Sequence, residues 1–191
     1  EVFHVPMEEV TAEQRRTAKA VNFGIIYGQT DYGLSRELGI SRREAQAYID
    51  LYFSRYPLVQ TFIHDTIEQA RAQGYVTTMM GRRRYIKDIN SRNRNLRQFA
   101  ERTAVNSPIQ GTAADIIKLA MIHCDKAIED NRLDAKMLLQ VHDELIFEVS
   151  REDALGLSLV VRKCMEDALK LNVPLKVDLK AGFNWQEMEK I

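Results

Sequence analysis

The sequence predicts an α+β fold, with helices through the first two thirds and antiparallel strands in the last third. The first part of the chain contains pairs of capping residues that start helices and glycines that end them. Near residue 140, two short apolar runs flank a polar, acidic tip, a pattern that favours a β-hairpin. Alternating apolar and charged residues from 175 to 179 predict a further, half-exposed strand.

The first two helices have clear start and stop signals. Thr11 followed by Gln14 is a capping-box pair, and Gly28 is placed to end the helix that begins there. A short second helix is expected through Leu38, where Gly39 ends it.

Two longer helices are expected next. Ser41 with Glu44 is a second capping-box pair, which predicts a helix that runs to about Tyr56. The helix after it covers residues 58 to 73 and ends at Gly74.

The middle of the chain combines a hairpin with a long helix. Residues 75 to 89 predict a small β-hairpin that turns near Gly81. Residues 94 to 130 predict a long helical stretch, bent around Pro108 and Gly111.

The last third contains most of the predicted sheet. Residues 133 to 149 form the hairpin with the acidic tip. Ser150 with Asp153 is expected to open an amphipathic helix that reaches about Leu171. The strand over residues 175 to 179 should then lie beside the hairpin.

Composition is that of an ordinary globular protein, with 191 residues, 45% hydrophobic and 28% charged. The sequence contains no apolar run long enough to span a bilayer and no secretory signal pattern at its start. Cys124 and Cys164 are far apart in sequence and match no metal-binding spacing. We therefore expect a cytoplasmic protein with reduced thiols and no membrane partner.

The net charge of zero conceals a basic block between residues 71 and 102. The block holds nine cations and two acids, a net charge of +7, and eight of the nine cations are arginine. Such a block is a candidate contact for a nucleic-acid phosphate backbone, and a solvated polar surface is the alternative. The excess of arginine over lysine favours nucleic acid, because arginine is the better partner for phosphate. Its cations are Arg71, Arg82, Arg83, Arg84, Lys87, Arg92, Arg94, Arg97 and Arg102.

Four residues of the first helix recur every four positions: Arg15, Lys19, Phe23 and Tyr27. Each step rotates about 40° around a helix, so the four share one stripe of its surface. Cations bind phosphates, and flat rings pack on a sugar or base. The stripe therefore has its cations at one end and its rings at the other, in the order of the parts of a nucleotide. The alternative is an amphipathic helix whose aromatic residues face a core.

The acidic tip of the second hairpin is a candidate metal site. Asp143 lies between His142 and Glu144, and a carboxylate there can hold a hard divalent cation. The alternative is an ordinary acidic turn.

Taken together, these motifs resemble the DNA polymerase family A of bacteria. Residues 15–28 match the family signature R-x-x-x-K-x-x-x-F-G-x-x-Y-G of the nucleotide-binding helix, and residues 141–144 match its V-H-D-E metal motif. Residues 106–115 resemble the family's N-x-P-x-Q-G-x-A-A-D segment. Two C-terminal segments also resemble the family, residues 173–175 and 182–185, so the likeness covers essentially the whole chain. The resemblance implies a helical fingers lobe over residues 1–90 and, over residues 91–191, part of a palm with an incomplete antiparallel sheet and flanking helices.

The resemblance implies roles for the helix stripe. Arg15 and Lys19 would contact the triphosphate of an incoming deoxynucleotide, with Lys19 nearer the reacting phosphorus and therefore catalytic. Phe23 would pack against the sugar, and Tyr27 would close the pocket around the new base pair.

At the hairpin tip, the resemblance implies that Asp143 is a catalytic ligand of two Mg²⁺ ions. Glu144 either adjusts that site or only carries surface charge, and both interpretations stay open. His142 is expected to orient the tip or contact the primer terminus, with a purely structural histidine as the alternative. Gln140 would add a contact to primer or template.

Four residues of the long helix are implied DNA contacts. Asn106 and Gln110 are four positions apart, so they would share a helix face and could reach the minor groove of primer–template DNA. Arg97 and Arg102 would contact the DNA backbone or the terminal pair. Ordinary helix surface is the alternative for all four.

The family's other metal carboxylate lies in a D-Y-S-Q-I-E-type strand, and this sequence contains no such segment. We therefore expect a C-terminal part of a polymerase that needs the missing N-terminal part as its partner, and that is inactive or nearly so alone. A non-catalytic DNA-binding module is the second hypothesis. A single-subunit RNA polymerase of the phage type fits less well, because N-F-G-x-x-Y-G with Phe23 resembles the DNA enzymes.

Overall fold

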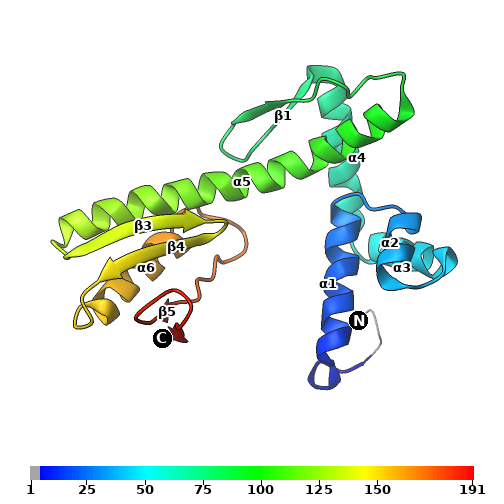
Figure 1. The fold of residues 1–191 in the computed structure, drawn as a ribbon. Coiled ribbons are helices and arrows are strands. Elements are labelled where there is room, and N and C mark those ends of the chain that lie inside the picture. Colours follow the sequence, from blue (N-terminus) through cyan, green and yellow to red (C-terminus); the bar gives the residue numbers. More distant parts are fainter. Residues whose placement is uncertain (1–4) are drawn as a thin grey trace. The chain divides into compact units, whose positions relative to one another are not determined.

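The computed structural model describes residues 5–191 and confirms the α+β class. The chain forms two compact units, which divide between Ile109 and Gln110 inside helix α5 (Arg94–Asp130) (Figure 1). No helix in the described part of the chain is both long enough and apolar enough to cross a membrane. The predicted functional boundary at residue 90 stays a prediction.

The first unit opens with a short 3₁₀ helix, η1 (Met7–Glu9), followed by α1 (Ala12–Ile26) and α2 (Asp31–Leu38). The capping box before α1 is confirmed, because Thr11 and Gln14 each accept from the other's backbone N–H.

Helices α3 (Arg42–Arg55) and α4 (Pro57–Gln73) follow as predicted. Ser41 and Glu44 form the second capping box, and Pro57 occupies the first position of α4, where its missing N–H costs no hydrogen bond.

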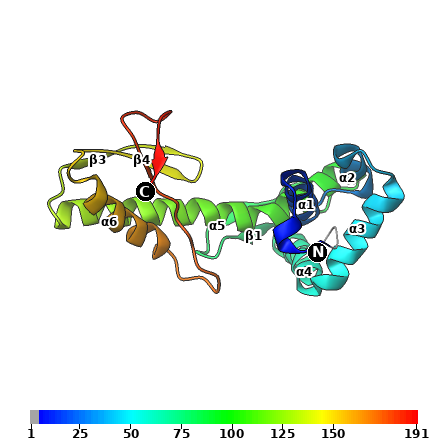
Figure 2. The same ribbon diagram turned by 90° about the horizontal axis from the view of Figure 1, so that it is seen from below.

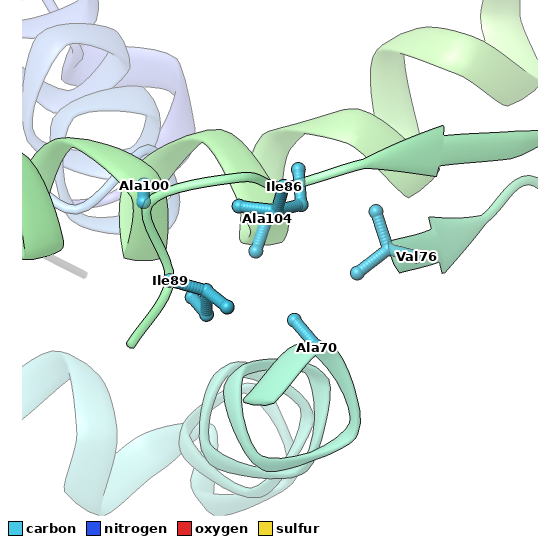
Figure 3. Close-up of a cluster of buried hydrophobic side chains, with 6 residues drawn as sticks. All are labelled: Ala70, Val76, Ile86, Ile89, Ala100 and Ala104. Atoms are coloured by element: carbon cyan, nitrogen blue, oxygen red, sulfur yellow. The ribbon is translucent and has the colours of Figure 1, made fainter. Parts of the chain in front are cut away.

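The predicted small hairpin consists of β1 (Tyr75–Thr77) and β2 (Arg83–Tyr85), paired antiparallel with Val76 opposite Arg84. A buried cluster joins this hairpin and the segment after it to α4 and the first turns of α5 (Figure 3). The cluster consists of Ala70, Val76, Ile86, Ile89, Ala100 and Ala104.

A second buried cluster lies where α1, α2 and α3 meet. Val21 and Ile25 of α1 pack with Leu34 of α2 and Ala45 of α3, and each is at most 3% exposed. This cluster fixes which side of α1 faces the protein and leaves the opposite side exposed.

Helix α5 is continuous through Pro108. Proline has no N–H to donate to the carbonyl of Ala104, and the neighbouring Ser107 hydroxyl donates to the carbonyl of Thr103. The predicted bend near Pro108 stays a prediction.

In the second unit, β3 (Ala135–Val141) and β4 (Glu144–Val149) form the predicted hairpin, with a bulge between Met137 and Leu139. Helix α6 (Ala154–Glu166) and the second part of α5 lie against one face of that hairpin (Figure 2). Cys124 from α5 and Leu157 and Val161 from α6 are the buried centre of this layer.

Two sequence predictions in the second unit are wrong. Helix α6 ends at Glu166 rather than near Leu171, and residues 175–179 form no strand. Their apolar side chains are half-buried and their charged ones exposed, so the alternation was correctly detected. A strand also needs a hydrogen-bonding neighbour, but the Val177 N–H donates to the Glu166 carboxylate instead.

The only β-pairing after α6 in the described residues joins two short strands, β5 (Lys180–Ala181) and β6 (Glu189–Lys190). The Ile191 N–H donates to the carbonyl of Leu179, which extends this contact by one residue. The end of the predicted strand is therefore held by the C-terminal residues instead of by the hairpin.

Candidate nucleotide, DNA and metal sites

The stripe on α1 lies away from the buried side of that helix. Arg15 and Lys19 are exposed, and neither makes an ion pair within residues 5–191. Phe23 is 44% exposed, and its ring stacks on the half-buried ring of Tyr27 at 6.1 Å between centroids and 16° between planes. The side of α1 that faces the core carries Val21 and Ile25 instead.

A hollow of about 460 Å³ opens beside the two rings, at the junction of α1 and α2. Its walls include both aromatic residues and Arg102 of α5, which is 75 positions beyond Tyr27 in the chain. The full lining is Ala20, Phe23, Gly24, Tyr27, Gly28, Gln29, Thr30, Gly33, Glu37 and Arg102.

Gly28 explains how Arg102 comes so close to the end of α1. The φ angle of Gly28 is 77°, in the left-handed region, and a Cβ at this position would lie 2.9 Å from Cγ of Arg102. Only glycine meets both requirements without strain. The structure therefore brings a predicted DNA-contact arginine to the two predicted nucleotide-contact rings.

The other predicted DNA-contact residues of the first unit differ in their surroundings. Asn106 is half-buried, and its Oδ1 has no hydrogen-bond partner among the residues that the structure describes. Arg97 donates to the carbonyl of Ser91 at 2.9 Å and lies 3.9 Å from the Glu101 carboxylate. A buried acceptor without a donor is costly, so the Asn106 amide is suited to a ligand or water.

The basic block is not uniform. Arg71 bridges Glu68 of its own helix and Glu101 of α5, each at 2.6 Å, and these carboxylates hold the pKa of Arg71 above its ordinary value. Arg83 places its guanidinium 4.7 Å from the ring centroid of Tyr75. The charge count alone could not separate an internal ion pair such as that of Arg71 from exposed cations.

In the second unit, the acidic tip of the β3–β4 hairpin is exposed and sharply turned. Val141 pairs with Glu144, so His142 and Asp143 alone form the turn. His142 has a φ of 55°, which is uncommon for a side chain larger than glycine, and the Gln140 amide donates to the His142 carbonyl at 2.6 Å. Gln140 therefore holds the turn that presents Asp143 to solvent.

The tip suits a hard cation but supplies few ligands. Asp143 and Glu144 are adjacent and exposed, and carboxylate oxygens are the ligands that Mg²⁺ prefers. No group of three or more His, Cys, Asp or Glu side chains is placed for metal binding within residues 5–191. Gln110, the remaining predicted DNA contact, is exposed in this unit.

Sequence reasoning missed Gln29 and its partner Glu37, which both line the hollow. In the sequence, Gln29 only belongs to the short polar run that follows Gly28. The signal that could have found it is the pair Gly24 and Gly33, because glycines inside helices mark close approach.

Comparisons with known proteins agree on one family. The sequence model of DNA polymerase family A matches residues 1–187. DNA polymerase I of Bacillus subtilis (strain 168) is 54% identical over 187 residues, which cover 98% of this chain and 21% of that protein. DNA polymerase I of Geobacillus stearothermophilus is 52% identical over 187 residues, with the same coverage.

A solved structure is similar along most of the chain. The POL domain of Pol1 from M. smegmatis, in complex with DNA primer-template and dNTP, matches with a TM-score of 0.88 and 49% identity. The match covers 92% of this chain and 31% of that one. This chain spans about a fifth of the length of the curated relatives that it matches. Since the family model, the relatives and the solved structure agree, the chain belongs to DNA polymerase family A.

Proposed function

We propose that this chain carries the nucleotide-binding surface, part of the DNA-binding surface and one part of the metal site of a DNA-directed DNA polymerase. In the reaction, a primer 3′-hydroxyl attacks the α-phosphorus of a deoxynucleoside triphosphate and releases pyrophosphate. One observation carries the proposal: Phe23, Tyr27 and Arg102 line one hollow, and the exposed cations Arg15 and Lys19 lie on the same stripe of α1 as the two rings. Residues 1–90 would be the fingers, and residues 91–191 a part of the palm.

On α1, Arg15 and Lys19 are free to bind the triphosphate, because neither is neutralised by an acidic partner in the described structure. Their fixed charge would offset the charge that develops on the phosphoryl oxygens and on pyrophosphate, with Lys19 closest to the reacting phosphorus. Phe23 would pack on the sugar, and Tyr27 would limit the space for the new base pair. The stacked pair of rings presents a flat apolar wall for this purpose.

At the hairpin tip, Asp143 would be the catalytic metal ligand, with Glu144 as a second candidate. Two Mg²⁺ ions, when bound, would lower the pKa of the primer hydroxyl and stabilise the leaving pyrophosphate. Mg²⁺ is commonly held by one or two carboxylates together with substrate phosphates, so an exposed pair of acids suits a shared site. Because the described residues supply no further ligand set, we expect the second carboxylate to come from another segment of a complete polymerase.

Primer–template DNA would bind through Arg97, Arg102, Asn106, Gln110, Gln140 and His142. Asn106 has the clearest structural reason, since its buried amide oxygen has no donor within residues 5–191. Minor-groove acceptors occur at similar places in every correct base pair, so amide side chains can check pairing geometry without reading sequence. We expect the protein to act in the cytoplasm, where DNA and deoxynucleotides are its partners.

Primer extension tests this proposal in two proteins: the 191-residue chain alone, and a fusion in which the chain replaces the 54% identical segment of the B. subtilis enzyme. The chain alone should bind primer–template DNA in a salt-sensitive way and extend it little or not at all. The fusion should extend the primer with Mg²⁺ and deoxynucleotides, and Asp143→Asn should abolish extension while preserving DNA binding. The intact B. subtilis enzyme is the positive control.

Two outcomes would contradict the proposal in different ways. Extension by the 191-residue chain alone, lost in Asp143→Asn, would mean that the complete metal site lies within this chain. A folded fusion that binds DNA but never extends a primer would favour the non-catalytic DNA-binding module.

A further inference from the structure

Gln29 fills a slot between two helices that both carry glycine at the point of contact. A Cβ at Gly24 of α1 would lie 2.0 Å from Gln29 Oε1, and a Cβ at Gly33 of α2 would lie 2.9 Å from Gln29 Cγ. No larger side chain could therefore face Gln29 from either helix without displacing it. Both helices therefore approach this one side chain closely.

Hydrogen bonds tie Gln29 to both helices. Its Nε2 donates to Oε2 of Glu37 near the end of α2, at 2.7 Å, and its backbone N–H donates to the carbonyl of Gly24 at 2.8 Å. Its Oε1 is buried and has no partner among the described residues. A buried acceptor without a donor is unfavourable. This conformation of Gln29 therefore depends on the hydrogen bond that its amide nitrogen donates to Glu37.

The same side chain forms part of the wall of the hollow that Phe23 and Tyr27 line. Tyr27 is the C-cap residue directly after α1, and Gln29 lies only two residues beyond it. Holding Gln29 therefore holds the turn that sets the direction of the Tyr27 side chain. The ring of Tyr27 in turn stacks on Phe23.

We propose that Gln29 is a positioning residue: its hydrogen bond to Glu37 fixes the α1–α2 turn and so keeps the Tyr27 ring in place for the nucleotide. The inference rests on the proposed function, because it gives Tyr27 a nucleotide to contact. Gln29 itself need not touch the substrate. We name the Gln29–Glu37 hydrogen bond the turn latch.

The kinetic test uses the fusion described above and steady-state extension with one deoxynucleotide varied. Gln29→Met keeps the length of the side chain but removes the donor, so KM for the nucleotide should rise about tenfold while kcat changes less than about twofold. Glu37→Gln keeps an acceptor for the Gln29 amide and should behave like the wild type. Glu37→Leu should reproduce the effect of Gln29→Met.

A matched control lies on α3, where Gln46 Nε2 donates to Asp50 Oδ1 at 2.8 Å. Gln46→Met removes the same kind of bond outside the hollow and should leave KM unchanged. The decisive variant is Gln29→Met in a Tyr27→Ala background, where the latch has no ring to position. There the additional rise in KM should vanish, a coupling that a general loss of stability would not produce.

Amide hydrogen exchange on the 191-residue chain tests the latch without any activity. Gln29→Met should accelerate exchange about tenfold at the turn amides of residues 28–33 and leave α3 and α4 unchanged. An unchanged KM, or a rise of equal size in the Tyr27→Ala background, would overturn the proposal. If the wild-type fusion never extends a primer, the proposed function fails. In that case hydrogen exchange still tests the turn latch, and a Gln29→Met chain with unaltered exchange at the turn would refute it.

Discussion

Replacing Arg71 and Arg84 by glutamine, one at a time, should separate structure from DNA binding within the basic block. Both arginines lie in the stretch with a net charge of +7. Arg84 is exposed on β2 and makes no ion pair within residues 5–191, whereas Arg71 bridges Glu68 and Glu101 at 2.6 Å each. We therefore expect the Arg84 substitution to weaken DNA binding and the Arg71 substitution to lower stability.

The magnitudes follow from these surroundings. A cation that neutralises one DNA phosphate adds about 0.9 to the slope of log affinity against log salt, so Arg84→Gln should reduce the slope by about that amount. Arg71→Gln should leave the slope unchanged. The side chains of Arg71 and Glu101 are 37% and 22% exposed, so solvent screens their ion pair, and its loss should cost about 1 kcal/mol of unfolding free energy.

Fluorescence anisotropy with labelled primer–template DNA, between about 50 and 200 mM salt, measures the slopes on the 191-residue chain. Urea unfolding measures the stabilities. Arg84→Lys is the matched control, because it keeps the charge and should keep the slope. A slope reduced as much by Arg71→Gln as by Arg84→Gln would refute the assignment of Arg71 to an internal bridge.

Further predictions concern three single residues. Gly28→Ala should cost about 1–2 kcal/mol of unfolding free energy in urea, because φ is positive and a Cβ would contact Arg102; an unchanged stability would contradict this. In the fusion, Phe23→Tyr should raise incorporation of dideoxynucleotides relative to deoxynucleotides, since its hydroxyl offers a hydrogen bond on the 3′ side of the sugar; equal use of both by the wild type would refute the reasoning. Burial raises the pKa of Cys124 to about 12, so a thiol reagent at about pH 8 should modify only Cys164 in the folded chain. Because the Cys124 thiol ionises first in the unfolded chain, stability should fall as pH rises from about 9 toward 12, and this loss should be smaller in Cys124→Ala.

The helices of the first unit could be predicted because their signals are local. A capping box needs only residues three positions apart, and both predicted boxes form, before α1 and before α3. The stripe on α1 depends likewise only on helical spacing, and the structure leaves it on the side of the helix away from the core.

The errors arise where the outcome depends on a distant partner. Residues 175–179 have the alternation of a strand but no adjacent strand within the described chain, and Glu166 takes the Val177 N–H instead. The bridge from Arg71 to Glu101 spans thirty positions, so the charge count could not identify it. The approach of Arg102 to Gly28 is equally invisible in sequence, although it builds one wall of the hollow.

Three glycines converge at the junction of α1 and α2, and each removes a different obstacle. Gly28 lets the chain turn while Arg102 passes over it, and Gly24 and Gly33 leave room for Gln29 from opposite sides. Glycine inside a helix costs up to about 1 kcal/mol relative to alanine, so two such positions facing one side chain weaken α1 and α2 locally. The Gln29–Glu37 hydrogen bond offsets part of that cost at the same place. If this balance sets the position of Tyr27, then Gly33→Ala should shift KM for the nucleotide in the same direction as Gln29→Met. Gly33→Ala displaces the Gln29 side chain and Gln29→Met removes its donor, so both changes break the hydrogen bond to Glu37.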